Sequence, residues 1–384
     1  MSGQLVDRVR FRLASAADTS VAAAASSESA LLLDAVALAE LSGELRTELT
    51  GAGPLEALLA EPGVTDVLVN AADSVWFDRG FGLERSPVRF DSDAVVRRLA
   101  ARLAAQAGRR LDDAAPFVDA VLPDGTRLHA ILPPLVAHPS ISLRVLGRRR
   151  LGLAELVALG AMDDELAELL VTVVRARLSL LISGGTGTGK TSLLAALLGT
   201  VEPAERIITI EDAAELTIEH PHVVALLARS QNVERAGAVE LAELVRQALR
   251  MRADRLVVGE FRGPEIVELL AALNTGHAGG AATVHANSVA DVPARLVALA
   301  ALGGMPAPTL AAQAASALDV LVHIRRDRTG LRRVEQLALW PRRSGTAAPE
   351  LVWTRLGGLG PAAGDLLARL DAAELARPAM LARL

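Results

Sequence analysis

The 384-residue chain contains no cysteine and no tyrosine. The lack of cysteine excludes disulfides, thiolate metal sites and cysteine nucleophiles. Three Trp and six Phe are the only aromatic residues, so platforms on which bases or sugars stack are not expected. Acidic residues (45) outnumber basic residues (40), and the resulting net charge of −5 is a poor match to a protein that coats nucleic acid.

Long apolar runs are also missing. The N-terminal residues carry scattered charges and no unbroken apolar segment, so a signal peptide is not expected. The longest uncharged stretch, between Arg295 and Asp319, is interrupted by glycine and proline, which favours two short helices over a membrane span. We therefore expect a soluble, cytoplasmic chain that reaches a membrane only through its partners.

Local composition divides the chain into five segments. An Ala/Leu-rich segment with helical periodicity ends at the sequence GAGP, and a segment of mixed helices and strands follows. An arginine-rich run then precedes a segment in which helices alternate with apolar strands. The predicted parts are a helical N-terminal arm, an α+β domain, an interdomain linker, an α/β domain and a partly helical C-terminal tail, at residues 1–50, 51–146, 147–152, 153–340 and 341–384.

Apolar strands predict the fold of the fourth segment. Helical periodicity lies between them, as at residues 239–249, and strands that are apolar throughout are buried on both faces. This alternation predicts an α/β fold with a mostly parallel sheet covered by helices. The candidate strands are Leu178–Ser183, Ile207–Ile210, His222–Leu227, Leu256–Gly259 and Ala281–Val284.

The only lysine of the chain, Lys190, lies in a glycine-rich loop. Residues 184–191 match the pattern G-x-x-x-x-G-K-[ST] between a predicted strand and a helical segment. Glycines let backbone amides wind around phosphate groups, an ammonium group pairs with the β- and γ-phosphates, and a hydroxyl binds Mg²⁺. The pattern predicts an ATP site, with Thr191 on the metal, made by Gly184, Gly185, Thr186, Gly187, Thr188, Gly189, Lys190, Thr191 and Ser192.

Acidic residues follow two of the predicted strands. Glu211 and Asp212 come directly after Ile207–Ile210, and Glu260 follows Leu256–Gly259. Open parallel sheets bind ligands at the carboxyl ends of their strands. Glu211 and Glu260 are therefore candidates to orient an attacking water or to hold Mg²⁺, directly or through water. The alternative is that these residues are solvated charges at the beginning of loops.

Histidines lie near the same predicted edge. His285 follows the strand Ala281–Val284, and His277 precedes it. His285 is placed to hydrogen-bond a γ-phosphate or the attacking water, although an isolated histidine is more often structural. A zinc site is not expected, because His220, His222, His277 and His285 do not have the spacing of a ligand cluster.

Four sequences in this order resemble the motifs of a known family. GGTGTGKTS, IITIEDAAEL, LRMRADRLVVGEFRG and NTGHAGGAATVHANS are similar to the Walker A, Asp-box, Walker B and His-box motifs of the ATPases of type II and type IV secretion and of type IV pili. The likeness is greatest to the tight-adherence (Tad/Flp) pilus assembly ATPases, TadA or CpaF. DVLVN, GRRLDDAAPFVDAVLPDGTRLHAILPP and SISLRVL resemble the N-terminal domain of that subfamily.

The resemblance implies a fold and residue roles. The fold would be a RecA-like P-loop ATPase domain preceded by a smaller α+β domain. Lys190 and Thr191 would bind phosphate and Mg²⁺. Glu211 would be the acidic residue near the attacking water, and Glu260 would be the Walker B glutamate.

Further residues receive roles from the same likeness. His277 and His285 would sense the state of the nucleotide. Arg127 and Arg144 match arginines of the N-terminal domain that reach the phosphates when the domains close, and Arg229 is a further candidate. The chain departs from the family pattern at two positions, because Ala225 and Leu227 stand where relatives often carry arginine and glutamate.

The implied function is that of a hexameric, Mg²⁺-dependent ATPase. It would power pilus assembly or protein secretion through polytopic inner-membrane platform proteins, without a direct nucleic-acid partner. One alternative is a DNA-translocating or conjugation-type ATPase, which shares the loop but fits the acidic composition poorly. The other is a nucleotide-gated scaffold that binds ATP without useful turnover, a role against which Glu260 argues.

Overall fold

The computed structural model describes residues 51–80, 82–145, 151–229, 237–340, 342 and 348–382. The helical arm predicted at residues 1–50 lies outside the described residues, as does most of the predicted linker. The described residues form two compact units, one up to residue 145 and one from residue 151. Each unit has a hydrophobic core of its own.

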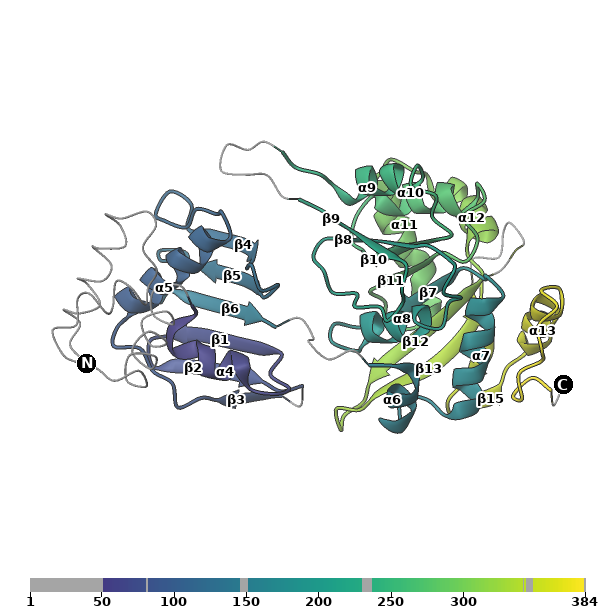
Figure 1. Ribbon diagram of the computed structural model, residues 1–384, viewed down its shortest axis with the longest axis horizontal. Helices are drawn as coiled ribbons and strands as arrows, with labels where there is room; N and C mark the ends of the chain where they lie inside the picture. The colour runs from purple at the N-terminus through teal and green to yellow at the C-terminus, as the bar shows by residue number, and fades with distance from the viewer. Residues whose placement is uncertain are drawn as a thin grey trace. The chain divides into compact units, whose positions relative to one another are not determined.

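The first unit is a six-stranded antiparallel sheet with helices on one face (Figure 1). The strand order is β3-β2-β1-β6-β5-β4. Helix α5 packs Val96, Leu99 and Leu103 into the core, beside alternate residues of the strands. The elements are η1 (Gly53–Leu55), α4 (Glu56–Ala60), β1 (Asp66–Ala71), β2 (Ser74–Asp78), β3 (Leu83–Arg85), α5 (Asp93–Gln106), β4 (Phe117–Val121), β5 (Arg127–Ile131) and β6 (Ser140–Arg144).

The second unit contains a nine-stranded mixed sheet in the order β15-β14-β13-β12-β7-β11-β10-β8-β9. The strands from β12 to β9 are parallel, and β13, β14 and β15 are added antiparallel. The elements are α6 (Leu153–Ala158), α7 (Asp164–Arg175), β7 (Leu180–Ser183), α8 (Lys190–Leu198), β8 (Ile207–Glu211), β9 (Val223–Leu227), α9 (Leu241–Ala248), β10 (Arg255–Phe261), α10 (Glu265–Leu273), β11 (Ala281–Val284), η2 (Val289–Asp291), α11 (Val292–Leu302), α12 (Ala307–Ala317), β12 (Val320–Arg326), β13 (Arg332–Leu339), β14 (Glu350–Thr354), β15 (Gly358–Leu359) and α13 (Ala363–Asp371).

Two hydrophobic cores lie on opposite faces of this sheet. Successive side chains of a strand point to opposite faces, so Leu180 and Ile182 join the core made with α6, α7, α8 and α13, whereas Leu181 joins the core made with α9 to α12. Figure 1 shows these helices around the sheet. Strands buried on both faces explain the apolar runs in the sequence, and the predicted α/β fold class is confirmed.

The C-terminal tail contains strands as well as a helix. It contains the expected helix, α13, but β14 and β15 also extend the sheet. Helix α13 packs Leu366 and Leu370 into the core, and Arg369 lies 3.2 Å from Asp319 Oδ1. The two strands are short and lie beside glycines, so their sequence has too little alternation to predict them.

The carboxyl ends of β7, β11, β10 and β8 share one edge of the sheet, because these strands are parallel neighbours. Strands β8 and β10 extend further than predicted, so Glu211 and Glu260 lie within them rather than after them. In the described part of the chain, no single helix is long and apolar enough to cross a membrane. Only a pair bent by 118°, Val289–Leu302 with Ala307–Ala317, meets the length and composition criteria jointly.

Candidate functional site

The glycine-rich loop joins the end of β7 to the beginning of α8. Gly187 and Gly189 have φ angles of 70° and 94°, which glycine adopts without the strain that a side chain would add. A Cβ on Gly184 would lie 2.4 Å from the carbonyl oxygen of Ile324, so this position also requires glycine. The Thr188 hydroxyl closes the loop by donating to the Gly185 carbonyl oxygen at 2.9 Å.

The remaining loop residues differ in exposure. Thr186 and Gly185 are exposed, whereas Thr191 and Ser192 are half-buried in the first turn of α8. Backbone amides at the beginning of a helix attract anions. The segment 184–192 therefore has the backbone geometry that a phosphate chain requires.

Lys190 is buried, with 6% of its surface exposed. Its Nζ donates to the carbonyl oxygens of Gly184 and Gly185 at 3.1 and 3.0 Å. The same nitrogen lies 3.6 Å from Glu260 Oε1. Burial lowers the pKa of Lys190, and the negative charge of Glu260 opposes this shift only in part. The lysine is thus a desolvated cation at the loop.

Glu260 connects three cationic or hydrogen-bonding partners. Its Oε1 lies 2.7 Å from His285 Nε2, and its Oε2 accepts from Arg262 Nε at 2.7 Å. Burial alone would raise the pKa of Glu260, but the hydrogen bond and charge of Arg262, together with His285 and Lys190, lower it below the ordinary value. Glu260 is therefore ionised at neutral pH.

His285 lies between Lys190 and Glu260. Burial and the nearby ammonium group of Lys190 lower the pKa of His285, so the ring is neutral at pH 7. Its Nδ1 lies 3.2 Å from Lys190 Nζ and its Nε2 lies 2.7 Å from Glu260 Oε1. A neutral ring with the proton on Nε2 suits both contacts, so His285 links Lys190 to Glu260.

Glu211 occupies the space that Gly259 leaves. The residue is buried, and its Oε1 accepts from the backbone amides of Glu215 and Leu216 at 3.0 and 2.9 Å. A Cβ on Gly259 would lie 2.8 Å from Glu211 Cγ. The glycine just before Glu260 thus makes room for the carboxyl group of the neighbouring strand.

We expect Gly259→Ala to destabilise the second unit and to reduce turnover. Glu211 is held by two backbone amides, so an added methyl group forces a shift that costs about 1–3 kcal/mol. Chemical denaturation measures this difference. Gly364→Ala is the control, because nothing lies within 4 Å of the added Cβ, and equal stability of the two variants would contradict the packing argument.

Magnesium fits the oxygen donors of this edge. Among the described residues, no group of three or more His, Asp or Glu forms a cage for a metal ion. Mg²⁺ usually takes one or two protein ligands and fills its other positions with phosphate oxygens and water. The Thr191 hydroxyl is suited to direct contact, whereas Glu260 and Glu211 have protein partners on their carboxylates and would hold the ion through water.

The remaining predicted residues have contacts of their own. His277 Nδ1 is 3.3 Å from the carbonyl oxygen of Ala272, on the helix that precedes it. In the first unit, Arg127 and Arg144 face each other across β5 and β6. Arg144 Nε donates to Asp66 Oδ1 at 2.8 Å. The two arginines therefore form one cluster within their own unit.

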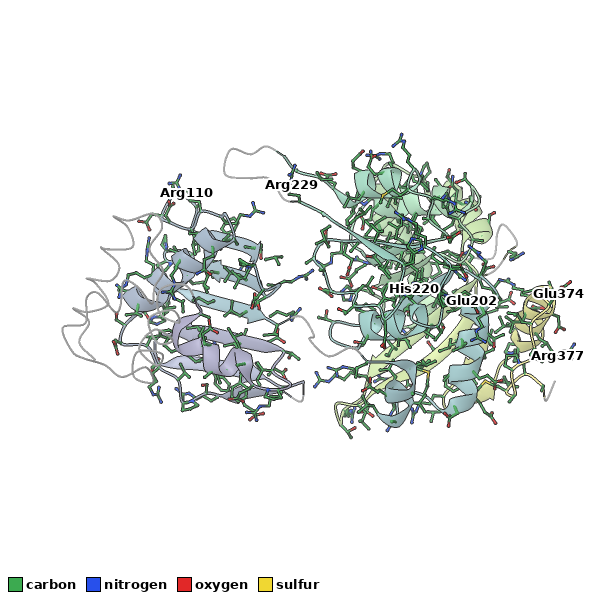
Figure 2. The ribbon with its side chains drawn as sticks, in the orientation of Figure 1. Arg110, Glu202, His220, Arg229, Glu374 and Arg377 are labelled. Carbon is green, nitrogen blue, oxygen red and sulfur yellow. The ribbon has the colours of Figure 1, made fainter. Side chains whose placement is uncertain are left out.

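Arg229 and His220, both labelled in Figure 2, have local partners. Arg229 Nε donates to the carbonyl oxygen of Gly237 at 2.6 Å. His220 Nε2 lies 3.1 Å from the Glu202 carbonyl oxygen, which joins the segment before β9 to the segment after α8. Both side chains thus bind backbone carbonyl oxygens of neighbouring segments.

Two arginines of the site were not predicted. Arg262 contacts Glu260, and its position two residues later in an extended segment is a signal that places both side chains on one face. Arg332 Nε donates to the carbonyl oxygen of Gly187 at 2.9 Å. No local pattern indicates that contact, because 145 positions separate the two residues.

Comparison with known proteins finds relatives that cover most of the chain. A family model described as "Type II/IV secretion system protein" matches residues 48–334. A putative conjugal transfer protein of Mycobacterium tuberculosis is 54% identical over 329 residues, covering 84% of this chain and 94% of that protein. The type IV secretion system protein PtlH of Bordetella pertussis is 32% identical over 327 residues, covering 77% of this chain and 95% of its own length.

Solved structures share the fold. The pilus retraction motor PilT with bound ADP has a TM-score of 0.53 and 20% identity, covering 76% of this chain and 83% of its own. The ATPase DotB of Yersinia pseudotuberculosis has a TM-score of 0.51 and 14% identity, covering 74% of this chain and 77% of its own.

Proposed function

Since this chain belongs to the type II/IV secretion system protein family, we propose that it is an ATPase motor that hydrolyses ATP to drive protein secretion or pilus assembly. The observation that carries the proposal is the cluster at the glycine-rich loop. Lys190, Glu260 and His285 come from three separate segments of the chain and lie within hydrogen-bonding or ion-pair distance of one another.

In the proposed reaction, the loop amides and Lys190 bind the phosphates of ATP. A water molecule hydrogen-bonded to Glu260 attacks the γ-phosphorus, and a bond forms between the water oxygen and that phosphorus. The bond from the γ-phosphorus to the bridging oxygen breaks, and its electron pair leaves with ADP. The proton of the water passes to Glu260 and then to the phosphate that is released. When bound, Mg²⁺ would neutralise charge on the phosphate oxygens.

Lys190 must exchange partners in this scheme. Its Nζ donates to two carbonyl oxygens of the loop, and phosphate oxygens would replace them because a hydrogen bond to a charged acceptor is stronger. His285 would stay in contact with Glu260 and would sense the change of partners of Lys190, because its Nδ1 is hydrogen-bonded to the same Nζ.

The arginines of the first unit supply the mechanical step in our proposal. Arg127 and Arg144 would contact the γ-phosphate before hydrolysis and lose that contact afterwards. A ligand shifts a conformational equilibrium only through its different affinity for the two states. The lost contacts would therefore be the source of the movement, and the segment 147–152 would be the hinge.

We expect Arg144→Ala to lower turnover at least about tenfold, because it removes one charge that stabilises the transition state, while ADP affinity stays near the wild-type value. Steady-state phosphate release and ADP titration measure the two quantities. Arg97→Ala is the control, since Arg97 is a half-exposed arginine of the same unit paired with Asp113. Unchanged turnover in Arg144→Ala would remove this residue from the mechanism.

The assembly that we propose is a homohexamer bound to polytopic platform proteins at the cytoplasmic face of the membrane. Its subfamily would be that of the tight-adherence pilus ATPases, as the four motifs and the N-terminal sequences suggest. Mass measurement in the presence of ATP tests the ring size. Co-purification with a membrane platform protein encoded nearby tests the partner, and a chain that stays monomeric and unbound would contradict both.

Conjugal DNA transfer is the second candidate, since the relative from Mycobacterium tuberculosis bears the description of a putative conjugal transfer protein. The net charge of −5 argues against direct contact with DNA. An ATPase assay with Mg²⁺, with and without DNA, separates the candidates. Strong stimulation by DNA that falls steeply with salt would favour conjugation, and absence of any turnover would contradict the motor.

A further inference from the structure

Arg262 lies between the ends of two strands. Its Nε and Nη2 are both 2.7 Å from Glu260 Oε2, and its Nη1 is 3.9 Å from Asp212 Oδ2. Asp212 follows β8 and Glu260 belongs to β10. The guanidinium is half-exposed, whereas the Glu260 side chain is only 18% exposed. The planar guanidinium of Arg262 thus approaches the mostly buried carboxylate of Glu260 from the solvent side.

The backbone of Arg262 is held in place by Glu265. This buried carboxylate accepts from the backbone amides of Arg262 and Gly263 at 2.6 and 2.9 Å. A Cβ on Gly263 would lie 3.0 Å from Glu265 Oε2, so the turn between β10 and α10 is tightly packed. The direction in which the Arg262 side chain leaves the backbone is therefore fixed.

The two oxygens of Glu260 have different surroundings. Arg262 engages Oε2 through the hydrogen bond from Nε and the ion-pair contact of Nη2, both at 2.7 Å. Oε1 lies 2.7 Å from His285 Nε2 and 3.6 Å from Lys190 Nζ. Oε1 thus faces Lys190, the side on which the γ-phosphate and the attacking water would lie in the proposed reaction.

We propose that Arg262 is a positioning residue for hydrolysis. By binding Oε2 of Glu260, it orients the carboxylate so that Oε1 faces the attacking water. The inference rests on the proposed ATPase function. In this proposal Arg262 does not contact the nucleotide. Removing its guanidinium therefore allows the Glu260 carboxylate to rotate but leaves the affinity of the loop for the phosphates unchanged. The titratable groups around Glu260 are Lys190 on α8, the neutral His285 after β11, Arg262, and the acidic Asp212 and Glu215 after β8.

The test compares Arg262→Ala with Arg246→Ala. The two arginines are matched, because both are half-exposed and both pair with glutamates, but Arg246 lies on α9. We expect Arg262→Ala to lower kcat by about 10- to 100-fold with KM within about twofold of wild type, the pattern of a lost transition-state interaction. Arg246→Ala is expected to keep both constants. Arg262→Lys is expected to recover only part of kcat, because an ammonium group lacks the fork.

A double-mutant cycle provides a readout that a merely structural role would not give. If Arg262 acts through Glu260, then Arg262→Ala should not reduce the residual single-turnover rate of Glu260→Gln any further. If Arg262→Ala lowers the single-turnover rate of Glu260→Gln by the same factor as it lowers the rate of the wild type, the proposal is overturned. An unchanged kcat in Arg262→Ala would overturn it as well. A raised KM with unchanged kcat would instead make Arg262 a nucleotide ligand and would also overturn it.

The design separates this inference from the proposed function. An active wild type with an unaffected Arg262→Ala variant contradicts only the positioning role. A wild type that binds ATP without turnover contradicts the motor itself, and the positioning role with it. Should Arg262→Ala fail to fold, Arg262→Lys carries the test, and full activity in that variant would overturn the requirement for a fork.

Discussion

Lys190→Ala is expected to abolish ATP turnover. The ammonium group is the only lysine charge in the chain, and it lies buried at the loop with Glu260 and His285 around it. Removing one donor that stabilises developing charge in a catalytic site costs about 10²–10³ in rate, and here the donor also binds the ground-state phosphates. We therefore expect turnover to fall at least about 100-fold and ATP affinity to fall with it.

Phosphate release and nucleotide titration measure these two losses. Lys190→Arg is the informative companion variant, because it keeps the charge but replaces a compact ammonium with a planar guanidinium. The space around Nζ is filled by two carbonyl oxygens and the His285 ring, so we expect this variant to be inactive as well. A Lys190→Ala variant with normal turnover would contradict the assignment of the site.

Loss of folding is not the expected cause of these effects. Lys190 is a desolvated cation whose pKa burial has lowered, so its removal relieves a desolvation penalty. The cost of leaving Glu260 without this ionic neighbour is limited by the other partners of Glu260. Glu260 keeps Arg262 and His285 as partners after the substitution. We therefore expect the thermal midpoint of Lys190→Ala to stay close to that of the wild type.

The central cluster was predictable because its signals are local or follow from topology. The loop pattern is continuous in sequence, and Glu260 and His285 follow apolar stretches that become neighbouring parallel strands. Parallel strands align their carboxyl ends, so residues 25 positions apart in sequence, such as Glu260 and His285, meet at one edge. Strand limits were less predictable, because β10 continues through Glu260 to Phe261.

Other features depend on packing that a single sequence does not encode locally. Gly259 lacks a side chain because Glu211 of the neighbouring strand fills the space, which is a contact between distant residues. Arg332 reaches the loop from β13, and β14 and β15 extend the sheet from a tail that lacks clear alternation. The contact of His277 with the Ala272 carbonyl oxygen on the preceding helix was likewise not predictable from its sequence position.

Glu260→Gln is expected to retain ATP binding and to lose hydrolysis. Glutamine has nearly the same volume and can still accept a hydrogen bond from Arg262 through its amide oxygen, so the packing of the site is preserved. It cannot take the proton of the attacking water, and general-base assistance is commonly worth about 10²–10⁴ in rate. We therefore expect the rate of phosphate release to fall at least about 100-fold.

Two measurements on the same preparation test this expectation, namely titration with ATP and the rate of phosphate release. Glu243→Gln is the control, since Glu243 is an exposed glutamate that pairs with Arg246 away from the site, and both of its measured values should match the wild type. Loss of ATP binding in Glu260→Gln would contradict a role confined to the chemical step. It would mean that the negative charge of Glu260 is needed to hold Lys190 and His285 in the positions that bind phosphate.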